Sequence, residues 1–216
     1  MVSDILIIGT GGQAHDVYAI INSINSQDKK WNICGFIDDN IENHDKIFCD
    51  LPIIGNSDWL INNHDISNLN VAIGDCKIRQ KIIEKISTDI HYQFPNLIHQ
   101  KSVVTNEVKL KNGISIHAGV LFGSNSQVGN HSILLYGSTI GHDTIIGNFV
   151  TICPGVHVNG SVTIGDGTYI GSGTVINQGI TIGSGCIIGS GSVVMDDIPD
   201  NVVATGYRAR PVKKND

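Results

Sequence analysis

The carboxyl-terminal half of the chain repeats a hydrophobic residue at every sixth position. The series runs from Val104 to Val194, and none of its sixteen members is polar. Because 41% of the chain is apolar, chance would produce such a run about once in a million trials. A small or β-branched residue stands four positions later in most repeats, and a glycine often follows directly, as at Gly141 and Gly165. The period therefore reflects regular structure.

A six-residue period of this kind predicts a solenoid of very short strands. Each strand with its glycine-assisted corner is too small to bury its own side chains, so successive repeats must stack and enclose the hydrophobic column. Three hexapeptides make a triangular coil, and residues eighteen apart then lie on neighbouring coils. We therefore expect His142 to lie against Gly160, and Ser172 against Ser190.

The amino-terminal part alternates short apolar runs with stretches of helical periodicity. The predicted elements, in chain order, are a strand over 5–8, a helix over 17–24, strands over 33–37 and 70–73, and a helix over 78–86. Strands that alternate with helices are typical of a small parallel, Rossmann-like sheet. The chain is thus expected to hold two domains, 1–96 and 97–216, the second ending in a short tail.

A parallel sheet of this kind binds ligands beyond the carboxyl ends of its strands, where a glycine-rich turn presents N–H groups at a helix start. The residues at those ends are Gly11, Gly12, Gln13, Asp38, Asp39 and Gly74. We expect the first three to hold phosphate, and either aspartate to accept hydrogen bonds from a base or ribose. A tight turn without a ligand, and aspartates that merely cap helices, are the alternatives.

The pattern Gly9-x-Gly11-x-x-Ala14 also matches the dinucleotide fingerprint. It would suit a nicotinamide-linked oxidoreductase, but about 90 residues leave too little sheet for a full dinucleotide fold.

Charge and cysteine content exclude several classes of partner. The net charge is −6 without a basic block before the last residues, which argues against nucleic acid or an anionic membrane. The five cysteines form no Cys-x-x-Cys pair, so we expect neither a disulfide framework nor a metal site. The chain shows no signal peptide and no stretch long enough to span a bilayer. A cytoplasmic protein without membrane insertion is expected.

His142-Asp143 is the pair in the solenoid best suited to chemistry, because it directly follows a corner where an imidazole can point outward. An imidazole has a reference pKa of about 6.5 and can take a proton near neutral pH. A neighbouring carboxylate favours its protonated form and can decide which ring nitrogen keeps its hydrogen. The alternative for any of these histidines is a solvated surface side chain.

Nearly the whole chain resembles the sialic acid O-acetyltransferase NeuD and PglD family of hexapeptide-repeat sugar acyltransferases. The matching segments are the turn 9–12, the strand ends 36–39 and 72–75, Ile78-Arg79, and His142 to Gly147 followed by Phe149, Pro154-Gly155 and Gly160. The resemblance implies an α/β Rossmann-like domain for a nucleotide sugar, followed by an all-β left-handed parallel β-helix. The handedness rests on the resemblance alone.

The same resemblance implies an acetyl-CoA-dependent acyltransferase, most simply one that N-acetylates a nucleotide-linked amino sugar, such as a 4-amino-4,6-dideoxy sugar, for surface polysaccharide or glycan synthesis. His142 would be the general base and Asp143 its partner. Acetyl-CoA would contact Thr151, Gly160, Ser172 and Ser190. O-acetylation of sialic acid or a related sugar, and a nucleotide-sensing scaffold without catalysis, are the alternatives.

Two further points concern assembly and the family pattern. Thr151 lies half a coil from His142, on another side of the solenoid. One donor molecule could contact both of these sides only if a neighbouring subunit supplied one of them, which predicts a homotrimer. Thr151 stands where the family often has histidine, Leu135 where some members have asparagine, and Arg208 where the family has proline. These replacements bear more on the acceptor than on the use of acetyl-CoA.

Overall fold

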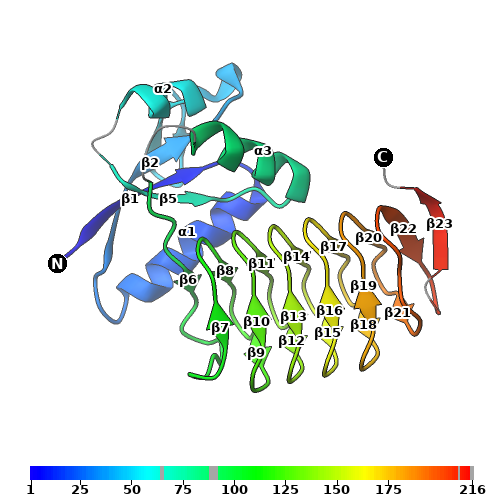
Figure 1. Cartoon of the computed structure of the whole chain (residues 1–216). Coiled ribbons are helices and arrows are strands. Elements are labelled where there is room, and N and C mark those ends of the chain that lie inside the picture. The colour runs from blue at the N-terminus through cyan, green and yellow to red at the C-terminus, as the bar shows by residue number, and fades with distance from the viewer. Residues whose placement is uncertain (64–65, 88–91, 209, 215–216) are drawn as a thin grey trace. The chain divides into compact units, whose positions relative to one another are not determined.

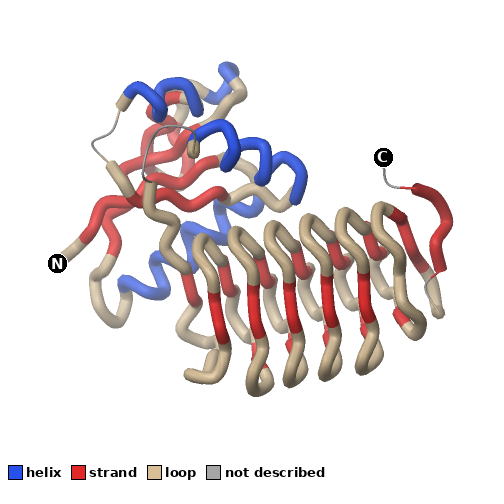
Figure 2. Tube along the Cα trace, viewed as in Figure 1, coloured by secondary structure: helices blue, strands red, loops and turns tan. Residues whose placement is uncertain are grey.

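The computed structural model describes residues 1–63, 66–87, 92–208 and 210–214. It divides into two units, Met1–His99 and Gln100–Asp216, whose elements are labelled in Figure 1 and coloured by type in Figure 2. Within the described residues, no helix has both the length and the apolar character needed to cross a bilayer.

The first unit is built on a five-stranded sheet ordered β3-β4-β2-β1-β5. All neighbouring strands pair in parallel except β3 and β4, which are antiparallel. The strands are β1 (Ser3–Ile8), β2 (Trp31–Ile37), β3 (Ile47–Phe48), β4 (Leu51–Gly55) and β5 (Asn68–Val71), with β6 (Leu97–Ile98) at the end of the unit. The helices are α1 (Gly12–Asn25), the 3₁₀ turn η1 (Ile41–Asn43), α2 (Ser57–Asn62) and α3 (Cys76–Ile86).

Strand β1 is apolar throughout its second half because both faces of the sheet are covered. Ile5 and Ile7 pack into one cluster with Val17 and Ile21 of α1. The residues that alternate with them, Leu6 and Ile8, are buried as well. A continuous apolar run is what a parallel strand covered on both sides requires, so this part of the sequence was interpreted correctly.

Part of the first unit was not anticipated from the sequence. The segment between β2 and β5 adds β3, β4 and α2, and β5 begins two residues earlier than the predicted strand 70–73. Gly35 permits the addition of β4, since a Cβ there would lie 2.7 Å from the carbonyl oxygen of Pro52. Such a close backbone approach leaves no apolar periodicity in the sequence, and the prediction missed it for that reason.

The second unit is a solenoid of two-residue strands, one in every six residues, that form three parallel faces. We name these faces the first, second and third sheets in chain order. The first holds β7 (Lys109–Leu110), β10 (Gln127–Val128), β13 (Ile145–Ile146), β16 (Thr163–Ile164) and β19 (Thr181–Ile182). The second holds β8 (Ser115–Ile116), β11 (Ile133–Leu134), β14 (Thr151–Ile152), β17 (Tyr169–Ile170) and β20 (Ile187–Ile188). The third holds β9 (Leu121–Phe122), β12 (Thr139–Ile140), β15 (His157–Val158), β18 (Val175–Ile176) and β21 (Val193–Val194).

Paired strands join residues eighteen apart, for example Thr139 with His157, as the predicted coil requires. Strand β22 (Val202–Thr205) continues the second sheet beside β20, and β23 (Arg210–Lys214) folds back against it in the antiparallel sense. The tail thus ends the sheet with a short hairpin.

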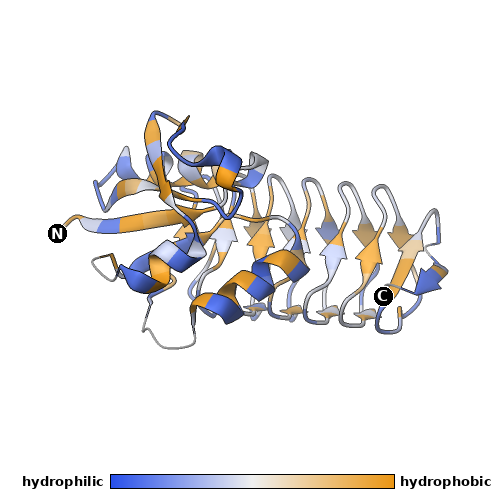
Figure 3. Cartoon of the chain, turned by 90° about the horizontal axis from the view of Figure 1, so that it is seen from above, coloured by the Kyte–Doolittle hydropathy of each residue, from blue (hydrophilic) through white to orange (hydrophobic). Residues whose placement is uncertain are grey.

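The repeated hydrophobic residues fill the inside of the solenoid. Each one from Ile116 to Val194 is buried, and the strands that carry them include several strongly hydrophobic ones in Figure 3. The small residues four positions later are buried too, and their hydroxyls bond to corner carbonyls, as from Ser132 to Gly147 at 2.8 Å and from Thr168 to Gly183 at 2.7 Å. These bonds satisfy polar groups that burial would otherwise leave costly.

Two kinds of corner position need different explanations. A glycine directly after the hydrophobic residue allows coils to stack, since a Cβ at Gly141 would lie 2.4 Å from the next coil's backbone. The left-handed backbone conformation occurs two residues further on, at Gly137 (φ 65°) and Gly155 (φ 67°), but also at Asn125 (φ 60°) and Asp143 (φ 55°). Asparagine and aspartate adopt this conformation more readily than other residues with a side chain. The glycines after the hydrophobic positions therefore act by close approach, not by positive φ.

Candidate functional site

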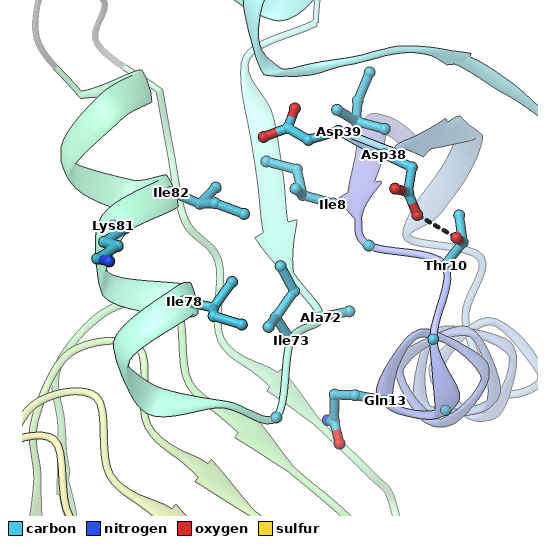
Figure 4. Close-up of a pocket in the computed structure, with 15 residues that line it drawn as sticks. Ile8, Thr10, Gln13, Asp38, Asp39, Ala72, Ile73, Ile78, Lys81 and Ile82 are labelled. Carbon is cyan, nitrogen blue, oxygen red and sulfur yellow. Dashed lines mark hydrogen bonds between the residues drawn. The ribbon is translucent and has the colours of Figure 1, made fainter. Parts of the chain in front are cut away.

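A cavity of about 440 Å³ opens at the carboxyl ends of β1, β2 and β5 in the first unit (Figure 4). All six residues predicted to bind a ligand line it, namely Gly11, Gly12, Gln13, Asp38, Asp39 and Gly74. Residues from three separate segments thus meet at one place, as the topology of a parallel sheet requires.

Three of these glycines leave open space where a side chain would be. A Cβ added at Gly11, Gly12 or Gly74 would have no heavy atom within 4 Å. Gly9 differs, since its φ of 107° and a 3.0 Å approach to the carbonyl oxygen of Ala72 explain why a glycine is needed there. Gly11 caps α1 without a side-chain hydrogen bond, so the N-terminus of this helix faces open space suited to an anion.

The two aspartates differ in how the chain already engages them. Asp38 accepts hydrogen bonds from the N–H of Asn40 at 2.8 Å and from the hydroxyl of Thr10, and Figure 4 shows the latter. One oxygen of Asp39 accepts from the N–H of Ser57 at 2.7 Å and from the Ser57 hydroxyl. Burial acts to raise the pKa of Asp39, but the bonds from Ser57 outweigh it and hold the pKa below its usual value. Both carboxylates therefore have structural roles beside any contact with a ligand.

The sequence reasoning missed the wall that α3 contributes. Ile78, Lys81 and Ile82 also line the cavity, and in Figure 4 Ile78 and Ile82 point from α3 toward the glycine-rich turn. Their spacing of i, i+3 and i+4 places all three on one side of a helix. That spacing was the available signal, but it was used only to predict the helix over 78–86.

The second candidate region lies in the solenoid, at the corner that connects the third sheet to the first. We call it the third corner; it comprises residues 123–126, 141–144 and 159–162 in three successive coils. Nδ1 of His142 lies 2.8 Å from Oδ2 of Asp143, so these sequence neighbours do touch. Their side chains are 55% and 52% exposed, and the pair is accessible to a substrate.

A hydrogen bond from Asn125, and then one from His142, hold the pKa of Asp143 below its ordinary value. The side-chain amide nitrogen of Asn125 lies 2.7 Å from Oδ1 of Asp143. The carboxylate is therefore ionised at neutral pH and acts as an acceptor on both oxygens. Asn125 lies eighteen residues before Asp143, and the coil length was the signal that could have identified it.

Gly160 lies directly against the imidazole of His142, one coil further on. A Cβ built at Gly160 would be 2.4 Å from Nε2 of His142, so only a glycine leaves room for the ring in this position. Gly160 is itself buried. Among the described residues its N–H has no hydrogen-bond partner, whereas the next N–H, of Ser161, bonds to the carbonyl of His142 at 2.7 Å.

The remaining predicted donor-binding residues lie on other sides of the solenoid. Thr151 belongs to β14 of the second sheet and is 1% exposed. Ser172 and Ser190 are exposed and follow strands of the second sheet, β17 and β20. A Cβ at Gly171 would lie 2.5 Å from the backbone nitrogen of Ser190, which shows how closely these two coils stack. One chain therefore brings Gly160 to His142 but leaves Thr151, Ser172 and Ser190 away from it.

Comparison with known proteins assigns both units. The model of the PglD N-terminal domain matches residues 4–86, and the model of the bacterial transferase hexapeptide (six repeats) matches residues 143–178 and 161–196. A search of curated proteins finds no match.

Solved structures match over both units together. Perosamine N-acetyltransferase from Caulobacter crescentus, a histidine-to-asparagine variant in complex with CoA and GDP-perosamine, is 29% identical with a TM-score of 0.90 over 99% of both chains. The acetyltransferase domain of PglB from Neisseria gonorrhoeae, in complex with acetyl coenzyme A, is 28% identical with a TM-score of 0.88 over 98% of this chain and 100% of that one. WeeI from Acinetobacter baumannii is 26% identical with a TM-score of 0.86 over 97% of this chain and 100% of that one. The chain thus joins a PglD N-terminal domain to hexapeptide repeats, and it is similar over nearly its whole length to sugar acetyltransferases of the PglD/NeuD family.

These matches confirm the predicted fold class, an α/β Rossmann-like domain followed by a left-handed parallel β-helix. The hexapeptide match begins at Asp143, within the third corner. The cavity lies within the segment that the PglD N-terminal model matches.

Proposed function

We propose that this chain is an acetyl-CoA-dependent acetyltransferase that acts on the amino group of a nucleotide-linked amino sugar. The observation that carries the proposal is the contact of His142 with Asp143 on one ring nitrogen while the other, Nε2, lies beside Gly160. The complexes of the Caulobacter enzyme with CoA and GDP-perosamine, and of the PglB domain with acetyl coenzyme A, support these classes of donor and acceptor.

His142 is suited to accept the proton that the acceptor must lose. As the sugar amine attacks the thioester carbonyl, a C–N bond forms and the amine proton passes to Nε2. The tetrahedral intermediate then collapses, the C–S bond breaks, and the proton can leave with the CoA sulfur. A positioned base contributes about 100-fold to 10,000-fold in rate, and Asp143 stabilises the imidazolium that forms.

Gly160 is suited to stabilise the oxyanion of that intermediate. Its N–H has no hydrogen-bond partner among the described residues, and a glycine has no side chain of its own to obstruct a bound thioester. An N–H aimed at the developing charge stabilises the transition state more than the substrate. Base and oxyanion donor would then belong to adjacent coils of one corner.

The cavity of the first unit is the site we assign to the nucleotide of the acceptor. The helix N-terminus at Gly12 and Gln13 offers N–H groups to a diphosphate, and the open space at Gly11 and Gly74 admits it. Ile78 and Ile82 provide an apolar wall against which a base can pack.

A homotrimer would complete the donor site. Thr151, Ser172 and Ser190 lie on other sides of the solenoid than His142, so they reach a donor at His142 only from a neighbouring subunit. Thr151 is already buried within one chain, which makes Ser172 and Ser190 the better candidates. Light scattering at micromolar concentration should give the mass of three chains, and a monomer would contradict this assembly.

Thiol release with a panel of nucleotide-linked 4-amino sugars and acetyl-CoA tests the function. We expect release with at least one amino sugar, and its loss in a His142→Asn variant that still binds acetyl-CoA. Activity on sialic acid or a related hydroxyl acceptor alone would favour the O-acetyltransferase alternative. A wild-type protein that binds a nucleotide sugar without releasing thiol from any member of the panel would favour the non-catalytic scaffold.

A further inference from the structure

The carboxylate of Asp143 is held at both of its oxygens. Oδ2 faces Nδ1 of His142 at 2.8 Å, and Oδ1 accepts a hydrogen bond from the side-chain amide of Asn125 at 2.7 Å. Rotation of the carboxylate about its own axis would break at least one of these contacts. The side chains of His142 and Asp143 are each about half exposed, so packing alone does not fix their orientation.

The contacts of Asp143 differ in kind from those of an aspartate at another corner. At the corner between the first and second sheets, Asp166 lies one coil after Asn148. Its carboxylate accepts hydrogen bonds from the backbone N–H of Asn148 at 2.8 Å and from the side-chain amide of Asn148 at 3.0 Å. That carboxylate satisfies a backbone group. The carboxylate of Asp143 bonds to no backbone group among the described residues. The hydrogen bond from Asn125 joins the two side chains only.

We propose that Asn125 is a positioning residue, which fixes the carboxylate of Asp143 so that Oδ2 stays on Nδ1 of His142 and Nε2 keeps the lone pair for proton transfer. This inference rests on the proposed function for its catalytic consequence, but not for its structural content. A neutral imidazole in water prefers neither tautomer strongly enough to serve as a base on one defined nitrogen. A hydrogen-bond acceptor beside Nδ1 keeps the proton on that nitrogen.

A purely conformational reason for Asn125 is the competing explanation. Its φ is 60°, and asparagine tolerates this left-handed conformation. Asn125→Gly separates the two explanations, because glycine retains the backbone conformation and removes only the amide. Asn201, with a φ of 56°, occupies a similar conformation away from the third corner, so Asn201→Gly is the matched control.

The decisive measurement is the ratio of the two neutral imidazole tautomers of His142, read from ¹⁵N shifts of histidine-labelled protein without substrates. The His142→Asn spectrum supplies the assignment. In the wild type we expect the hydrogen on Nδ1. In Asn125→Gly the ratio should move toward Nε2–H by about threefold to tenfold, the range that one hydrogen bond of ordinary net strength supports, while Asn201→Gly leaves it unchanged.

Turnover provides the second measurement. In Asn125→Gly the kcat should fall by about threefold to tenfold with the KM for each substrate within twofold. In an Asp143→Gly background the carboxylate is gone, so Asn125→Gly should have no further effect on the tautomer ratio of His142 or on kcat. The effects of mutating two residues that act through one contact do not add.

An unchanged tautomer ratio in Asn125→Gly overturns the inference, even in an active enzyme. The inference is also overturned if Asn125→Gly lowers kcat equally with and without the Asp143 carboxylate, because Asn125 would then act independently of that carboxylate. A changed ratio supports the positioning role even if no sugar in the panel is acetylated, and in that case only the proposed function fails.

Discussion

Gly160→Ala tests whether the imidazole of His142 works from the position it occupies in the structure. The new Cβ would lie 2.4 Å from Nε2 and 2.6 Å from Cε1 of the ring. Ordinary contact needs about 3.5 Å, so the ring must move by about 1 Å. The φ of Gly160 is not positive, and the obstructing group is the half-exposed end of a side chain. The ring can therefore move away with little loss of folding stability.

A displacement of about 1 Å in a catalytic group can cost about 100-fold in rate, or about 2.7 kcal/mol of activation free energy. We expect kcat for thiol release to fall by about that factor while the melting temperature changes little. Gln178→Ala, at the equivalent position one coil further on, is the control and should keep wild-type kcat. Because alanine retains the N–H of residue 160, the loss reports on His142 and not on the oxyanion contact.

Two results would refute the reasoning about Gly160. A folded Gly160→Ala enzyme that keeps more than a third of wild-type kcat would show that the imidazole does not act from this position. An equal loss caused by Gly160→Ala in a His142→Asn background would show that the glycine acts independently of the ring.

Three further predictions concern the catalytic pair, the cavity and stability. His142→Asn should remove at least 90% of the rate, because the positioned base is lost, while Asp143→Asn should cost less; kcat for thiol release checks both. Gly12→Ala places a methyl group in open space of the cavity, so calorimetry should find nucleotide-sugar affinity at least about tenfold weaker, about 1.4 kcal/mol, without a lower melting temperature. The folded-state pKa of Asp39 is depressed, so its contribution to stability is present above the unfolded value of about 3.9 and is lost as pH falls through the folded one. Thermal unfolding should therefore show wild type more stable than Asp39→Asn at pH 7, with the difference shrinking below about pH 4.

The solenoid could be predicted from the sequence because its core is periodic. The same six-residue spacing that buries Ile140 and Ile146 also sets the coil length, and the coil length places Gly160 against His142. The six residues of the first unit that line the cavity could be predicted to meet for a similar reason, since parallel strands end at one edge of a sheet.

Contacts between side chains of different coils or segments could not be predicted in the same way. The bond from Asn125 to Asp143 depends on two residues that both adopt positive φ, and the bond from Ser57 to Asp39 depends on a helix that the periodicity did not reveal.

The sequence by itself determined where each coil begins, which residues face inward and where a histidine follows a corner, because these depend on local spacing and hydrophobicity. The tertiary structure alone decided that Asp143 turns back to His142, that Asn125 holds its other oxygen, and that Thr151 is buried. Those outcomes depend on side-chain directions and on neighbours distant in the chain, and neither is encoded in a hydrophobic period.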